Sequence, residues 1–366
     1  MLLVIGGCCL TVVSGSDEND AGSMTSGAAC VPGPASDLQT YASYGSNALG
    51  AAASGDLNGD GLLDFVAVQT SLMGGGLVYV FFGQPDGGLS APVTYEGSDD
   101  FALALGDLNG DGWLDLAVSN DNEIDILMNN GAGAFSLSTS LATPGAGVTG
   151  IGIGDFNSDG FGDVVVSEYF SSPSAPLSYD AKLFLNEGSG NFGAAIPLPG
   201  VGGTLYQGLA VGDLNQDGLP DIAAASSDQD AGGLVVLINR GDGGFQTTFY
   251  PTVPSLYGQV VLLPHEGAAP DLILGRVEGV GGLEVLKNSG HGTFPTGDFY
   301  PIPGGISIAV GDFNGDCIPD VATSSFGGCE VGDGFALSVL YGAADGGFGP
   351  VESLDAGGRT LGGLAA

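Results

Sequence analysis

Five ten-residue segments of this chain gather carboxylate side chains at a fixed spacing. The first is GDLNGDGLLD at residues 55–64, and close copies begin at Gly106, Gly154, Gly212 and Gly311. Counted from its first aspartate, every copy has Asp at position 1, Asn at position 3, and Asp at positions 5 and 9. Side chains at alternate positions of a tightly curled loop can converge, and oxygen donors without nitrogen or sulfur favour calcium over zinc. The pattern therefore predicts a calcium-binding loop.

We expect each loop to hold calcium through the side chains at positions 1, 3, 5 and 9 and the backbone carbonyl of position 7. A glycine at position 6 permits a sharp turn in four copies, whereas the fifth copy has Cys317 there. Of about five calcium sites, the fifth should therefore be the weakest. The predicted ligands are Asp56, Asn58, Asp60, Leu62 and Asp64; Asp107, Asn109, Asp111, Trp113 and Asp115; Asp155, Asn157, Asp159, Phe161 and Asp163; Asp213, Asn215, Asp217, Leu219 and Asp221; and Asp312, Asn314, Asp316, Ile318 and Asp320.

The beginning of this pattern is shared with the EF-hand, which can be excluded. An EF-hand needs a bidentate glutamate at position 12 and helices on both sides of the loop. Short apolar runs of strand type flank these loops instead. Position 12 is occupied, in chain order, by Ala67, Val118, Val166, Ala224 and Thr323.

The loops recur with a period near 50 residues, which indicates a repeat fold. The intervals between their first aspartates are 51, 48, 58 and 99 residues. An insertion at residues 168–179, EYFSSPSAPLSY, accounts for the interval of 58. The interval of 99 contains a degenerate copy, in which Asp271 keeps position 9 but Leu263, His265 and Gly267 replace positions 1, 3 and 5.

Each repeat contains four short apolar runs bounded by Gly, Asn and Asp, and no window of helical period. Four strands in about 50 residues predict one blade of a β-propeller. Six full blades can be counted, and the two ends of the chain add an outer and an inner strand. We therefore expect an all-β, seven-bladed propeller whose last blade lacks its middle hairpin in this chain. The alternative is a closed six-bladed ring with a spare C-terminal strand.

The pattern D-x-N-x-D-G-x-x-D between strands, with FG or GGF some 25 residues later, resembles the FG-GAP or VCBS repeat of integrin alpha chains and bacterial surface proteins. The later element is found in YVFFGQPDGGL, VLINRGDGGF and LYGAADGGF. The resemblance covers about residues 35–366. It implies a seven-bladed propeller with calcium in hairpin loops on one face. It implies no particular activity, because such propellers occur in adhesion proteins, in lectin-like binders and beside polysaccharide-active enzymes.

The charge of the chain excludes several partners. Forty-two acidic residues against five basic ones give a formal net charge of −37, which disfavours nucleic acid and anionic membrane surfaces. A divalent cation is the natural counterion for such a chain. We expect a monomer with no transmembrane span.

The N-terminus predicts export to the cell surface or the extracellular space. Residues 1–15 are apolar but too short to cross a bilayer, which is typical of a signal peptide or lipoprotein leader. Two processing routes remain open: a lipid anchor on Cys8, or cleavage after Gly15. We interpret residues 16–34 as a polar linker and residues 35–366 as the propeller. Cys30, Cys317 and Cys329 are too few for a disulfide framework, and we expect no disulfide between Cys317 and Cys329.

Few other residues suggest chemistry. His265 and His291 are interpreted as solvated turn residues, and the ring of Trp113 as a packing element rather than a sugar platform. The sequence Arg240, Gly241, Asp242 spells RGD, but its glycine serves the turn of the repeat. We therefore expect a non-enzymatic binding, adhesion or structural module for a protein or carbohydrate partner, with residues 168–179 as its most individual feature. The alternative is the propeller domain of a polysaccharide-active lyase or hydrolase, or a lectin-like carbohydrate binder.

Overall fold

The computed structural model describes most of the repeat region. The described residues are 2–6, 9–13, 39–41, 49–69, 76–97, 102–145, 147–172, 175–188, 190–199, 206–226, 233–251, 257–265, 267–276, 281–302, 307–324, 336–344, 346–355 and 361–365. Within these residues the secondary structure is strands and turns, and no helix is long and apolar enough to span a membrane. The all-β prediction is therefore confirmed for the described part of the chain.

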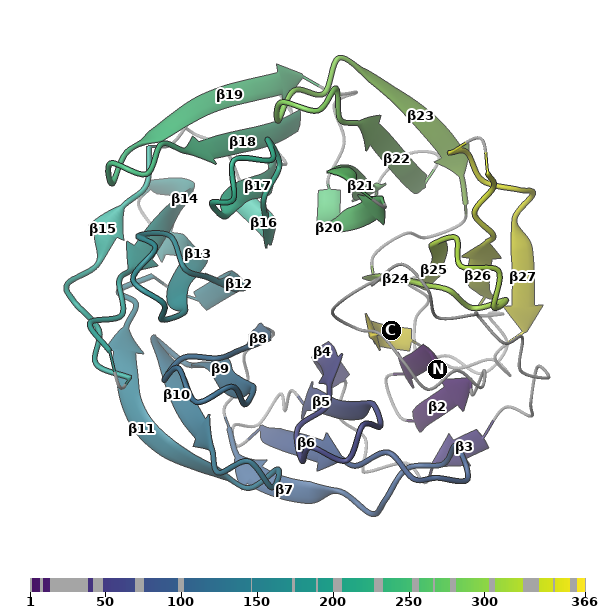
Figure 1. Ribbon diagram of the computed structural model, residues 1–366, viewed down its shortest axis with the longest axis horizontal. Coiled ribbons are helices and arrows are strands. Elements are labelled where there is room, and N and C mark those ends of the chain that lie inside the picture. The colour runs from purple at the N-terminus through teal and green to yellow at the C-terminus, as the bar shows by residue number, and fades with distance from the viewer. Residues whose placement is uncertain are drawn as a thin grey trace.

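Seven four-stranded antiparallel sheets surround a central axis, as the blades of a propeller (Figure 1). Six blades follow one another along the chain, each from four consecutive strands. Blade 1 contains β4 (Leu49–Gly55), β5 (Asp64–Gln69), β6 (Leu77–Phe81) and β7 (Val93–Glu96). Blade 2 contains β8 (Leu103–Gly106), β9 (Asp115–Asn120), β10 (Glu123–Asn129) and β11 (Phe135–Ala142). Blade 3 contains β12 (Gly147–Gly154), β13 (Asp163–Ser172), β14 (Ala175–Phe184) and β15 (Ile196–Pro197).

The next three blades repeat this order. Blade 4 contains β16 (Tyr206–Gly212), β17 (Asp221–Ser226), β18 (Gly233–Asn239) and β19 (Phe245–Pro251). Blade 5 contains β20 (Tyr257–His265), β21 (Ala268–Arg276), β22 (Gly282–Lys287) and β23 (Thr296–Pro301). Blade 6 contains β24 (Ser307–Gly311), β25 (Asp320–Ser324), β26 (Ala336–Leu340) and β27 (Glu352–Asp355). These six blades correspond to the six repeats counted in the sequence.

The seventh sheet is assembled from both ends of the chain. Its strand order is β28 (Leu361–Ala365), β1 (Leu2–Gly6), β2 (Cys9–Val13) and β3 (Gln39–Tyr41). The inner strand β28 and the outer strand β3 come from the segments that the sequence assigned to a half-blade. The prediction that this blade lacks its middle hairpin is wrong, because β1 and β2 form that hairpin. Residues 2–13 belong to the predicted leader, whose removal stays a prediction, and the linker at residues 16–34 lies outside the described residues.

The hydrophobic core lies between adjacent blades. Val66 and Val68 of blade 1 pack in one buried cluster with Leu116 and Val118 of blade 2. The other interfaces between blades 2 and 6 contain equivalent clusters. Because both faces of the sheets in blades 2 to 5 are covered, their middle strands are near-continuous apolar runs, and burying each Val or Leu contributes about 1.5–3 kcal/mol.

The innermost strands approach one another closely, which explains their small residues. A Cβ added to Gly106 would lie 2.6 Å from Cγ2 of Ile153, in the next blade. A Cβ added to Gly152 would lie 2.4 Å from Cγ2 of Val211. Real Cβ contacts are longer than this, so larger residues would push these strands apart.

The inserted residues lengthen the middle hairpin of blade 3. Strands β13 and β14 have ten residues each, whereas β9 and β10 of blade 2 have six and seven. The hairpin between second and third strands lies at the opposite end of a blade from the loop between first and second strands. The insertion and the aspartate loops are therefore at opposite ends of the propeller.

Candidate metal centres

The aspartate loops join the first and second strands of blades 1, 2, 3, 4 and 6. We number them by blade: loop 1 is residues 56–64, loop 2 is 107–115, loop 3 is 155–163, loop 4 is 213–221 and loop 6 is 312–320. The degenerate copy, loop 5, is residues 263–271 of blade 5. The six loops lie at the same end of the ring, because successive blades repeat one strand order.

The aspartate at position 1 organises each loop. In loop 1, Oδ1 of Asp56 accepts the backbone N–H groups of Gly59 (2.7 Å) and Asp60 (3.2 Å), and Oδ2 accepts that of Gly61 (3.0 Å). Asn58 Oδ1 accepts from Asp60 N–H at 2.9 Å, and Asp60 Oδ1 accepts from Leu62 N–H at 2.8 Å. The bond from position 6 to position 1 recurs in all five intact loops, at distances of 2.7 to 3.0 Å. The five loops therefore share one backbone conformation.

Two positions in each loop adopt left-handed backbone conformations. Position 6 has φ between 82° and 92° in the four glycine loops, and Cys317 takes φ 67° in loop 6. The strained cysteine expected from the sequence is thus found, and Cys317 also takes part in a disulfide bond. Cys30 and Cys329 lie outside the described residues.

Position 4 is left-handed as well, with Ser158 (φ 59°) and Gln216 (φ 65°) where the other loops have glycine. The sequence pattern does not indicate this second turn, because Ser and Gln stand at position 4 in two of the loops.

The aspartate at position 9 is buried, and backbone N–H groups occupy both of its oxygens. Asp64 is fully buried; its Oδ2 accepts from Leu57 N–H (2.9 Å) and its Oδ1 from Gly83 N–H (2.8 Å). Gly83 begins the turn between the third and fourth strands, so this carboxylate ties the loop to a neighbouring turn. The same pair of bonds is made by Asp115, Asp163, Asp221 and Asp320.

The environment of the position 9 carboxylates is unfavourable for negative charge. Burial raises the pKa of these aspartates to about 6, and the charges at positions 5 and 1 of the same loop raise it as well, while the N–H bonds act in the opposite direction. Three carboxylates thus repel one another in each loop. Among the described residues, none of these carboxylates is ion-paired with Lys, Arg or His.

The donors that face solvent are those of positions 1, 3 and 5. Over the described part of the chain, no three Asp, Glu, His or Cys side chains are arranged to hold a metal, since position 9 is directed to its N–H partners. Loop 1 offers two carboxylates, Asp56 and Asp60, with the amide oxygen of Asn58. The Nδ2 group of Asn58 donates to Asp60 Oδ2 at 3.0 Å, and the equivalent bond occurs in loops 3, 4 and 6. The donor chemistry of these residues fits calcium, with positions 1, 3 and 5 as the accessible side-chain ligands.

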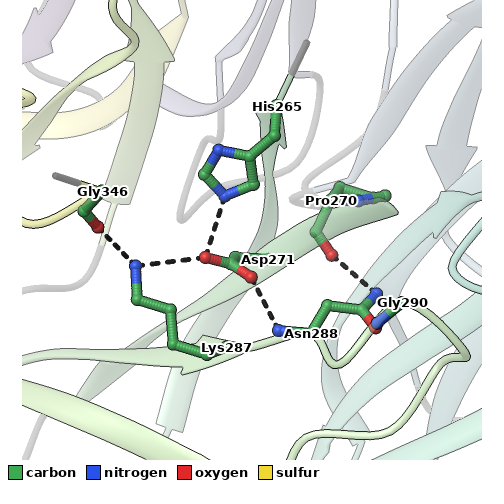
Figure 2. A network of polar contacts seen from close by, with 7 residues as sticks. All are labelled: His265, Pro270, Asp271, Lys287, Asn288, Gly290 and Gly346. Carbon is green, nitrogen blue, oxygen red and sulfur yellow. Dashed lines mark hydrogen bonds and ion pairs between the residues drawn. The ribbon is translucent and has the colours of Figure 1, made fainter. Parts of the chain in front are cut away.

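In blade 5 the position 9 carboxylate contacts the side chains of His265 and Lys287 (Figure 2). Its position 2 is Pro264, which has no N–H to donate to the position 9 carboxylate. Asp271 Oδ2 instead lies 2.9 Å from His265 Nε2 and 3.2 Å from Lys287 Nζ, while Oδ1 accepts from Asn288 N–H at 2.6 Å. The interpretation of His265 as a solvated turn residue is therefore incomplete, because its ring contacts a buried carboxylate.

The segments that contain loops 1 to 4 match a family of known repeats. Residues 56–118, 107–166 and 172–224 match the FG-GAP-like repeat. This chain contains FG-GAP-like repeats. The matched residues run from loop 1 into the second strand of blade 4, with a gap at residues 167–171, and blades 5 and 6 continue the same strand order.

Solved structures share the fold at low sequence identity. A lectin from Agrocybe aegerita that recognises non-reducing terminal N-acetylglucosamine has a TM-score of 0.60 and 18% identity, over 97% of this chain and 89% of that chain. A Bacteroides fragilis protein proposed to be a 6-phosphogluconolactonase has a TM-score of 0.54 and 15% identity, over 98% and 97%. A variant of AofleA from Arthrobotrys oligospora has a TM-score of 0.51 and 13% identity, over 86% and 89%. No curated protein sequence matches this chain. At these identities the likeness concerns the fold alone.

The position 7 side chains pack neighbouring FG-GAP-like repeats together. A Cβ added to Gly59, in loop 1, would lie 2.7 Å from the Trp113 ring of loop 2. A Cβ added to Gly131, in the turn of blade 2, would lie 2.6 Å from Nε1 of the same ring. The Trp113 ring therefore lies between two glycines and remains 37% exposed. Asp242 of the RGD sequence accepts from Gly244 N–H at 3.0 Å, as expected for a residue of the turn.

At the opposite end, the lengthened hairpin contains a buried ion pair. Lys182 Nζ contacts Glu168 Oε1, and Glu168 is fully buried. The other oxygen, Oε2, accepts from Gly145 N–H at 2.7 Å, and the ammonium group lies 5.5 Å from the centre of the Phe170 ring. Burial lowers the pKa of Lys182. These contacts join β13 to β14 near the base of the hairpin and connect β13 to Gly145. The side chains of residues 171–179 lie outside the described part.

Proposed function

We propose that this chain is an exported, calcium-stabilised β-propeller that acts as a non-enzymatic binding module. The observation that carries the proposal is the difference between intact and degenerate loops. Each intact loop has Asp at positions 1, 5 and 9, and none of these carboxylates is ion-paired with a protein cation among the described residues, whereas loop 5 keeps only the position 9 carboxylate of this set, which contacts His265 and Lys287. Charges a few Å apart repel by kcal/mol amounts at a protein surface, so a bound divalent cation would relieve the intact loops.

Calcium would be held by the residues at positions 1, 3 and 5 of loops 1, 2, 3, 4 and 6. When bound, it supplies positive charge and fixes the loop; this chain's own residues form the turn and present the oxygens. The hydrogen bond that Asn Nδ2 donates to the position 5 carboxylate would break, so that the carboxylate oxygen could bind the ion. Position 9 holds the loop against the blade. We propose loop 6 as the weakest site, because Cys317 takes the left-handed conformation that glycine adopts without strain.

The binding role rests on the shape of blade 3. The two strands of its middle hairpin are longer than those of blades 2 and 4, and insertions in repeat proteins often form a binding face. A protein or a carbohydrate is the proposed partner, consistent with the fold shared with a lectin of 18% identity.

The test of calcium binding is isothermal titration of chelator-treated protein with calcium chloride, with magnesium chloride as the control. We expect calcium to bind at about five sites, with dissociation constants in the range of about 10⁻⁴ to 10⁻³ M that is typical of extracellular modules. Absence of calcium binding at millimolar concentration would reject the calcium part of the proposal. Binding to a glycan array in calcium, with and without deletion of residues 171–177, tests the binding module.

A further inference from the structure

Four asparagines connect consecutive blades at the end that contains the loops. They are Asn129, Asn186, Asn239 and Asn288, and each stands where the third strand of blades 2 to 5 ends. In each case Nδ2 donates to the backbone carbonyl at position 2 of the preceding blade's loop. The distances are 2.8 Å to Leu57, 2.5 Å to Leu108, 2.8 Å to Phe156 and 2.8 Å to Leu214.

The same side chain also binds within its own blade. Asn129 Nδ2 donates to the carbonyl of Leu114, at position 8 of loop 2 (3.0 Å), and its Oδ1 accepts from Gly131 N–H (3.1 Å). Its backbone N–H donates to the position 9 carboxylate of Asp115 at 2.7 Å. One buried amide thus contacts the loop of its own blade and the loop before it. Aspartate lacks the donor and glutamine is longer, so asparagine suits this geometry.

The distribution of these asparagines follows the state of the preceding loop. Blades 1 and 6 have Gly83 and Gly342 at the same place, each donating its N–H to its own position 9 carboxylate. The blade before blade 6 has the degenerate loop 5, with Pro264 at position 2. Asparagine is therefore present in the four blades that follow an intact loop, and glycine takes its place in blade 6, which follows the degenerate loop 5.

A role within the turn alone does not explain this distribution, because all six blades have the turn. Between blades 5 and 6 a different contact is made: Lys287 Nζ, already bound to Asp271, donates to the carbonyl of Gly346 at 2.5 Å (Figure 2). That interface is therefore held by a cation of the protein.

We propose that the four asparagines are positioning residues that couple the calcium loop of one blade to the loop of the next. This inference rests on the calcium binding proposed above. An ion fixes the backbone of its loop, including the position 2 carbonyl that lies between two ligands, and the asparagine then holds the next loop in its ordered form. The second ion meets a loop that is already ordered, which is positive cooperativity. Loops 1 to 4 form one coupled series, and loop 6 binds independently.

The first experiment compares Asn129→Gly with Asn130→Gly in the full chain. Asn130 is the neighbouring residue, is exposed, and accepts hydrogen bonds only from Ala132 and Ala134 of its own turn among the bonds described for its side chain. We expect Asn129→Gly to lower calcium affinity at loops 1 and 2 by about fivefold or more, as for typical coupling energies, and to reduce the Hill coefficient. Asn130→Gly should match the unaltered protein. Equal titration curves for the two variants would overturn the coupling.

A second experiment leaves every asparagine in place. Asp60→Asn weakens calcium binding at loop 1. Amide hydrogen exchange of this variant is then measured in the presence of calcium at two turns, residues 129–134 of blade 2 and residues 341–347 of blade 6. We expect protection to fall at least severalfold in the blade 2 turn and to stay unchanged in the blade 6 turn. Unchanged protection in both turns would overturn the coupling but not calcium binding. If the unaltered protein binds no calcium, the proposed function and this inference are both overturned.

Discussion

The ammonium group of Lys287 lies 3.2 Å from the carboxylate of Asp271, in the one blade whose loop has lost its other acidic positions. His265 approaches the same oxygen at 2.9 Å, where Pro264 has removed the N–H that the other loops provide. The position 9 carboxylate is thus retained in all six repeats, whereas the group that contacts its second oxygen has changed. The carboxylate ties the loop to the next turn, a role that needs no metal.

We predict that Lys287→Met destabilises the propeller equally with and without calcium. The substitution removes the contacts of the ammonium group with Asp271 and with the Gly346 carbonyl, and the side chain is only partly exposed. The expected loss is about 1 kcal/mol of unfolding free energy, measured by thermal or urea unfolding. Arg240→Met is the control, because Arg240 is exposed and forms no ion pair among the described residues. A loss that disappears in calcium would contradict the prediction.

Removal of calcium should lower the melting temperature of the whole propeller. A ligand that binds only the folded state stabilises it by about 2.7 kcal/mol per site at one hundred times the dissociation constant. The measurement is thermal unfolding in excess calcium, in chelator, and in magnesium at equal ionic strength. We expect a higher midpoint in calcium than in chelator, with magnesium close to chelator. Coincident midpoints in calcium and chelator would mean that the loops are not filled.

Substitutions at positions 9 and 5 of one loop should have different effects. Asp64→Ala leaves the buried N–H groups of Leu57 and Gly83 without acceptors, and each such loss costs about 1–3 kcal/mol. Asp60→Ala removes an exposed carboxylate whose bonds are local to the loop. In chelator, Asp64→Ala should therefore unfold at lower urea concentration than Asp60→Ala. In calcium, Asp60→Ala should lose one bound ion by titration. Equal stability of the two variants in chelator would argue against the separate role of position 9.

The repeat period, the strand order and the loop positions could be predicted from the sequence because they depend on local patterns. The apolar runs, the glycines and the Asp–Asn–Asp spacing all lie within about ten residues of one another. The bonds of position 9 could be predicted only in part, since Asp64 and its partner Gly83 are 19 residues apart and meet only in the folded blade. The contact of Asn129 with Leu57 spans 72 residues, and no local pattern indicates it.

The strand pairing of the seventh sheet could also not be predicted from local sequence patterns. The apolar segment of residues 1–15 has the composition expected of a leader, and its composition is equally suitable for two strands. In the structure, Leu3 pairs with Ala365 and Val4 with Leu364, at opposite ends of the chain, while the leader stays a prediction. A pattern read along the sequence cannot identify partners so distant, although the outer and inner strands of that blade were predicted.

The contact between Gly106 and Ile153 predicts how closely the inner strands are packed. A Cβ at residue 106 would lie 2.6 Å from Cγ2 and 3.1 Å from Cβ of Ile153, so Gly106→Ala requires blades 2 and 3 to separate slightly. Overpacking of this kind typically costs about 1–3 kcal/mol, measured as a lower midpoint in urea. Ile153→Ala alone should also destabilise, by removing buried methyl groups. The double variant Gly106→Ala/Ile153→Ala should be more stable than the sum of the two losses predicts, because the smaller side chain makes room for the new methyl group. Strict additivity of the two losses would show that these residues do not limit the approach of the inner strands.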